Sequence, residues 1–148
     1  MKKRILVVGP EDSGKREVIQ FLEGRREIKL IESIVYGSRT IYVPDSYLRS
    51  PGMKKHIIAT QQNAYCIVML LPSDRNYRVY SPNFAQVFRI PSLGVIVHHS
   101  EQLENNTTDC LLELRETGVN ELIELDLENN DTYVALLEKI KKLKEGNQ

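Results

Sequence analysis

Three apolar stretches without polar alternation constrain the fold of this chain. They span residues 4–8, 65–71 and 93–97. A strand with one solvated face alternates apolar and polar side chains, whereas a strand covered on both faces is a continuous apolar run. The three stretches therefore predict central strands of a largely parallel sheet that has helices on both faces.

Weaker strand patterns and amphipathic helical patterns alternate with these runs. Further strands are predicted at 33–37, 40–43 and 121–125, and helices at 14–23, 50–62, 107–117 and 131–144. Ser50 is the predicted N-cap of the second helix and Pro51 its first residue. This alternation predicts a three-layer α/β sandwich around a mostly parallel six-stranded sheet. No internal repeat or linker is evident, so we expect a single domain over residues 1–148.

The composition is that of a globular protein, with 41% hydrophobic and 27% charged residues. Twenty basic and 20 acidic side chains cancel, so no overall charge favours nucleic acid or a membrane as a partner. No apolar run approaches the roughly 20 residues of a membrane span, and the N-terminal run is shorter than the roughly 7–15 residues of a signal peptide. We therefore expect a cytoplasmic protein. Cys66 and Cys110 lie among apolar residues and are predicted to be reduced core residues.

Gly9, Gly14 and Lys15 form the pattern G-x-x-x-x-G-K directly after the first strand. In a phosphate-binding loop of this pattern, backbone N–H groups and the lysine surround a phosphate at the start of a helix. The next residue should carry a hydroxyl that holds magnesium. Here it is Arg16, whose guanidinium offers no lone pair to a metal.

The predicted phosphate- or nucleotide-binding residues are Gly9, Pro10, Glu11, Asp12, Ser13, Gly14, Lys15 and Arg16. Glu11 and Asp12 place carboxylates where an anion would bind. Two interpretations are open. In the first, Glu11 or Asp12 pairs with Lys15 or Arg16, and the loop is empty and self-neutralised. In the second, the loop binds phosphate. We predict no catalytic residue and no metal site, since His98 and His99 are strand neighbours that point to opposite faces.

This loop and the order of the elements resemble the ethanolamine- and propanediol-utilisation GTPase-like family, often written EutP/PduV. The similar segments are "RILVVGPEDSGK", "SIVYGSRTIYVPDSYL", "LLPSDRNYRVYSPNF" and "PSLGVIV", and together they run nearly end to end. The resemblance implies a Ras-like P-loop NTPase fold and GTPase-like or ATP-dependent acetate kinase activity. It also implies ATP or GTP with magnesium as ligands, and microcompartment or pathway proteins as partners.

Two of the family's motifs that serve the phosphates are changed at the matching positions. The Asp-x-x-Gly that supports magnesium falls on Tyr42, Val43, Pro44 and Asp45. Ile31 stands where the resemblance places the switch threonine. Every magnesium ligand that the resemblance implies is therefore missing.

The motifs that read the base are changed as well. The guanine-reading Thr/Asn-Lys-x-Asp falls on Val97, His98, His99 and Ser100, with Glu101 one residue away. Leu125 and Asp126 take the places of the Ser-Ala that backs the base.

We therefore predict a degenerate member of this family. Its expected role is accessory or interactive, in ethanolamine or propanediol catabolism, with at most weak binding of nucleotide or phosphate and no efficient GTP hydrolysis. Phosphoryl transfer depends on magnesium and on positioning, and both are weakened here. Two alternatives stay open: an active NTP-binding enzyme, and a module that binds a phosphorylated metabolite.

Overall fold

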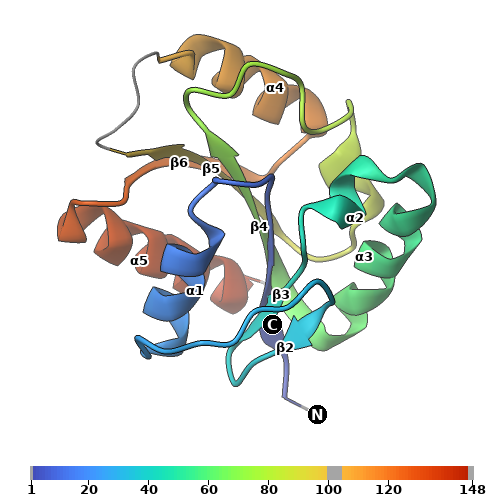
Figure 1. Ribbon diagram of the computed structural model, residues 1–148, viewed down its shortest axis with the longest axis vertical. Coiled ribbons are helices and arrows are strands. Elements are labelled where there is room, and N and C mark those ends of the chain that lie inside the picture. Colours follow the sequence, from blue (N-terminus) through green and yellow to red (C-terminus); the bar gives the residue numbers. More distant parts are fainter. Residues whose placement is uncertain (1, 100–104, 147–148) are drawn as a thin grey trace.

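A computed structural model describes residues 2–99 and 105–146, which form a twisted sheet between two layers of helices (Figure 1). The strand order is β2-β3-β1-β4-β5-β6. The strands are β1 (Arg4–Val8), β2 (Val35–Tyr36), β3 (Thr40–Tyr42), β4 (Ala64–Pro72), β5 (Ser92–His98) and β6 (Glu121–Asp126). Only β2 is antiparallel to its neighbour in this described sheet. The predicted mostly parallel, six-stranded sheet is confirmed.

The helices of the described chain lie on both faces of this sheet. They are α1 (Lys15–Glu23), α2 (Ser46–Arg49), α3 (Lys54–Thr60), α4 (Thr107–Thr117) and α5 (Asn130–Gly146). Short 3-10 helices are η1 (Pro51–Met53), η2 (Gln61–Asn63) and η3 (Phe84–Val87). Within residues 2–99 and 105–146, no helix combines the length and the apolar character that a membrane span needs.

Two apolar clusters hold the layers together. Along β1, Ile5 and Val7 pack into the cluster under α1 and α5, whereas Leu6 and Val8 pack into the cluster under α2, α3 and α4. Successive side chains of a strand point to opposite faces, so a strand buried on both sides must be apolar throughout. This arrangement explains the runs without alternation and confirms that they are central strands.

The predicted helix at 50–62 is instead three consecutive pieces, η1, α3 and η2. Pro51 does begin η1, but the Ser50 side chain makes no capping hydrogen bond to it. The tight 3-10 turn at each end shortens the α-helical part. The short α2 and η3 were not predicted, because neither is long enough to show helical periodicity. Cys66 and Cys110 are free and buried, as predicted.

Candidate phosphate-binding site

Residues 9–14 form a loop that joins the carboxyl end of β1 to α1, and Lys15 is the first residue of the helix. Asp12 and Gly14 have the left-handed φ values of +58° and +82°. Glycine adopts this conformation without steric cost, and aspartate tolerates it better than most residues. The predicted loop between the first strand and the first helix is confirmed; its binding of phosphate remains a prediction.

The hydroxyl of Ser13 lies inside this loop, over Gly9. A Cβ atom added at Gly9 would lie 2.6 Å from Ser13 Oγ, so only glycine leaves room for the hydroxyl. Ser13 is 1% exposed, and its Oγ has no hydrogen-bond partner among the described residues. A buried hydroxyl without a partner costs about 1–3 kcal/mol. Such a group is expected where a ligand completes the site.

The backbone around Ser13 offers further free donors. Within the described parts of the chain, the amides of Asp12, Ser13, Gly14 and Lys15 donate to no protein acceptor. The first hydrogen bond of the helix runs from Val18 N to Gly14 O, at 3.0 Å. Unpaired amides at a helix N-terminus, together with the positive pole of the helix, attract an anion.

The Lys15 side chain does not point along the loop but lies against the end of β3. Its Nζ donates a hydrogen bond to Val43 O at 3.0 Å and lies 5.1 Å from the centre of the Tyr42 ring. Burial lowers the pKa of Lys15 to about 8, although the nearby carboxylates, that of Asp45 foremost, raise it in part. The ammonium is thus held by a carbonyl and an aromatic ring rather than by an anion.

One of the two alternatives for the loop, internal neutralisation by an ion pair, is not found among the described residues. Glu11 and Asp12 are exposed, and neither forms an ion pair with Lys15 or Arg16 among the residues described. Arg16 instead reaches Ile28 O, at 3.5 Å. The Lys15 ammonium is directed to Val43 O instead.

Two cavities flank the loop, and both are poor in available positive charge. The larger, of about 640 Å³, is lined by Glu11, Asp12, Gly14, Glu17, Pro72, Asp74, Arg75, Asn76, Tyr77, His99 and Leu127. The smaller, of about 340 Å³, is lined by Pro10, Asp45, Leu48, Arg49, Tyr77, Arg78 and Val79. Every arginine in these linings has a carboxylate partner: Arg75 pairs with Glu113, Arg78 with Glu116 and Arg49 with Asp45.

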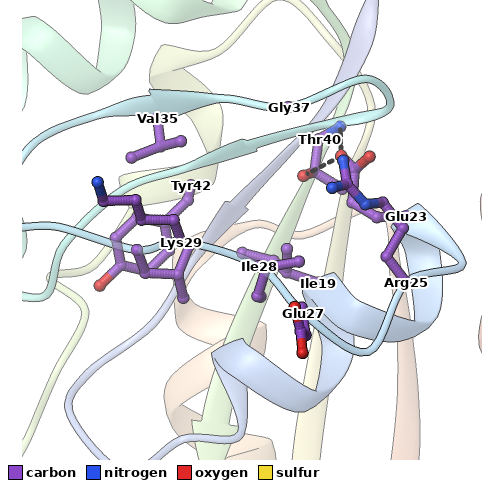
Figure 2. Close-up of a pocket in the computed structure, with 11 residues that line it drawn as sticks. Ile19, Glu23, Arg25, Glu27, Ile28, Lys29, Val35, Gly37, Thr40 and Tyr42 are labelled. Carbon is purple, nitrogen blue, oxygen red and sulfur yellow. Dashed lines mark hydrogen bonds between the residues drawn. The ribbon is translucent and has the colours of Figure 1, made fainter.

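A third cavity, of about 450 Å³, lies between α1 and the β2–β3 hairpin (Figure 2). Its floor is formed by apolar side chains that include Ile19 and Ile28. At one end the Glu23 carboxylate accepts hydrogen bonds from the Thr40 hydroxyl, at 2.7 Å, and from the amides of Arg39 and Thr40, at 2.9 Å each. Burial acts to raise the pKa of Glu23, but these hydrogen bonds hold it below its usual value. Glu23 therefore anchors the hairpin, and this cavity contains none of the loop residues.

The tertiary structure adds residues that the sequence analysis did not name. Asp74 comes from the segment after β4 and Leu127 from the segment after β6, and Leu127 Cδ2 would lie 3.1 Å from a Cβ atom on Gly14. Ligands of open α/β sheets bind beyond the carboxyl ends of the strands. Applied to β4 and β6, that rule would have pointed to these residues.

The chain was compared with known families and structures. The family described as "Ethanolamine utilisation - propanediol utilisation" (PduV-EutP) matches residues 1–142. The chain belongs to this family. The "Propanediol utilization protein PduV" of Citrobacter freundii is 27% identical over 95 residues, which are 64% of this chain and 63% of that protein.

Solved structures similar to this PduV-EutP family member show the fold. A "probable GTP-binding protein engB" superposes with a TM-score of 0.63 at 14% identity, covering 97% of this chain and 99% of that one. A mutation variant of SsGBP superposes with a TM-score of 0.57 at 15% identity, covering 97% of this chain and 57% of that one. The predicted P-loop NTPase fold is confirmed.

The positions that match the family's metal and base motifs can now be placed in this PduV-EutP protein. Tyr42, at the position of the metal-supporting aspartate, places its ring beside the Lys15 ammonium. His98 Nε2 lies 2.8 Å from Glu124 Oε1, and His99 Nε2 lies 3.2 Å from Asp74 Oδ2. The two histidines thus contact different elements.

Ser100, at the position of the guanine-reading aspartate, and Glu101 beside it lie outside the described residues. Among those described, no group of three or more histidine, cysteine or acidic side chains has a geometry that suits a metal ion. The side chains present at the matching positions do not fit magnesium, since Arg16 and Tyr42 supply a cation and a phenol ring.

Proposed function

We propose that this PduV-EutP family member binds phosphate groups weakly, and without magnesium, through residues 9–16. In this proposal it acts as an accessory or interaction protein in ethanolamine or propanediol catabolism, with cytoplasmic pathway or microcompartment proteins as partners. The observation that carries the binding proposal is the buried Ser13 hydroxyl, which has no partner in the described structure. A phosphate oxygen is a strong acceptor for this hydroxyl and for the free amides beside it.

Weak binding follows from the charges around the loop. Glu11, Asp12 and Asp74 line the larger cavity, where they repel an anion. The arginines of both cavities already pair with carboxylates. Lys15 must give up its hydrogen bond to Val43 O before it can reach a phosphate, and this exchange reduces the net gain on binding.

Titration calorimetry with ATP, GTP and inorganic pyrophosphate, each with and without magnesium, tests this proposal. We expect weak binding whose Kd differs little between the two nucleotides and is unchanged by magnesium. A tenfold tightening with magnesium, which equals about 1.4 kcal/mol, would show that other residues hold the ion. Phosphate release in a single turnover, above the rate without protein, would favour an active enzyme instead.

Replacing Ser13 with alanine should separate stability from binding. We expect the free energy of unfolding to rise by about 1 kcal/mol, because an unpaired buried hydroxyl is removed. Pyrophosphate binding should weaken in the same variant, because a donor to the ligand is lost. Urea denaturation and calorimetry measure the two effects.

Ser50→Ala serves as the control, since Ser50 is exposed and its side chain caps no helix. Neither quantity should change in it. A Ser13→Ala protein that binds pyrophosphate as tightly as the unmodified chain would contradict the proposed site.

A further inference from the structure

A fourth cavity lies near the N-terminal start of β1 and the end of α5. These two segments are at the end of the sheet opposite the loop at residues 9–14 (Figure 1). The cavity has a volume of about 290 Å³. Its cationic residues are Lys2, Lys3, Arg39, Lys141 and Lys144, and we call it the basic cavity. The strand β1 runs from this cavity to the loop, so the two sites are separated by the length of the sheet.

The five cations come from three separate parts of the chain, and all five are exposed. No aspartate or glutamate lines the cavity, and none of the five takes part in an ion pair among the residues described. The chain as a whole has no net charge, so this concentration does not reflect a basic composition. The dipole of α5 favours a cation such as Lys144 in its last turn, but it does not explain the other four.

The floor between these cations is apolar. Ile5, Leu22 and Ile140 are buried there, and Leu137 is half-buried beside them. The small volume, at the low end of the range for small-molecule sites, suits one aliphatic side chain rather than a whole ligand. A ring of cations around an apolar floor is complementary to an acidic segment that carries one aliphatic anchor.

We propose that the basic cavity binds an acidic segment of a partner protein, which inserts one aliphatic side chain between the cations. A membrane surface fits less well, because none of the exposed large apolar side chains of the described chain lines the cavity. Single-stranded nucleic acid also fits less well, because stacking needs a free aromatic face. Tyr65, the aromatic residue of the lining, is half-buried with Lys144 Nζ 4.9 Å from its ring centre.

Fluorescence anisotropy with the full chain tests this proposal. The probe is a short labelled peptide of glutamates around a single leucine. Two reference peptides replace the glutamates with glutamines or the leucine with glycine. We expect the acidic leucine peptide to bind more tightly than both references, and added salt to weaken its binding.

The variant K141E/K144E reverses two cations of the cavity, and K55E/K142E reverses two exposed lysines outside it. The charge change is the same in both. We expect the Kd to rise at least about tenfold in the first variant and less than about twofold in the second. K3E/R39E is a second test in case K141E/K144E does not fold, as judged by circular dichroism.

Several results would overturn the proposal. These are an acidic peptide that does not bind, an equal loss in the cavity variant and its control, or equal binding of the leucine and glycine peptides. Preferred binding of phosphatidylserine vesicles or of a single-stranded oligonucleotide, lost in K141E/K144E, would assign the cavity to another partner. All of these readouts are independent of ligand binding at residues 9–16.

Discussion

Replacing Lys15 with methionine is expected to stabilise the protein by about 2 kcal/mol at neutral pH. Lys15 is 8% exposed, and burial lowers the pKa of its ammonium from 10.5 to about 8, against the raising effect of Asp45. That difference in pKa corresponds to a destabilisation of the folded protein by about 3 kcal/mol when Lys15 is charged. The variant also lacks the hydrogen bond to Val43 O, which reduces the gain by about 1 kcal/mol. Methionine retains the buried apolar stem without the charge.

The expected gain depends on pH. The pKa of Lys15 is lower in the folded protein than in the unfolded chain, so the unfolded chain binds the proton more tightly. The destabilisation is therefore complete below pH 8 and disappears as the pH rises towards 10.5. The advantage of Lys15→Met should be largest near neutral pH and shrink across this window.

Denaturant unfolding of both proteins at neutral pH and near the upper end of the window measures this effect. Lys55→Met, at an exposed position of α3, is the control and should show no such change with pH. If the gain in the free energy of unfolding from Lys15→Met stays constant with pH, the lowered pKa of Lys15 is contradicted. Groups with a shifted pKa cluster at functional sites, and Lys15 belongs to the proposed phosphate site. The same variant should therefore also bind pyrophosphate more weakly.

Replacing Glu113 with alanine is expected to destabilise the protein by about 3–5 kcal/mol. Glu113 is 2% exposed and accepts hydrogen bonds from the amides of Val79 and Tyr80, at 3.0 and 2.9 Å. Its carboxylate also lies 2.9 Å from Arg75 Nη2. The alanine variant leaves a largely buried guanidinium without its counter-charge and two amides without their acceptor.

Glu116→Ala is the matched control on the same helix. Glu116 pairs with Arg78 at 2.7 Å, but the two side chains are 51% and 45% exposed. An exposed ion pair contributes at most about 1 kcal/mol, so the control should lose much less stability in urea. Similar losses in the two variants would contradict a special role for the buried Glu113. Because Arg75 and Val79 line the cavities beside the loop, Glu113→Ala should also weaken ligand binding.

Much of the architecture follows from local sequence patterns. A strand that is buried on both faces is a continuous apolar run, so β1, β4 and β5 could be recognised from their runs without polar alternation. The loop at residues 9–14 could be recognised because glycine at fixed positions permits a left-handed turn and a close approach of the Ser13 hydroxyl. Both signals are contained within a few consecutive residues.

Contacts between distant segments decided which residues line the candidate site and where the Lys15 side chain lies. Lys15 could reach a phosphate or a carboxylate, but it lies against Val43, 28 residues away in the chain. Leu127 and Asp74 approach the loop only because parallel strands bring their carboxyl ends to one edge of the sheet.

The basic cavity depends in the same way on three segments that meet around β1 and α5. The sequence by itself determined the layered sheet and the loop, because backbone conformation and burial follow from residue type and spacing. Only the tertiary structure decided which charges meet, because the position of a long charged side chain depends on partners that residue order does not reveal.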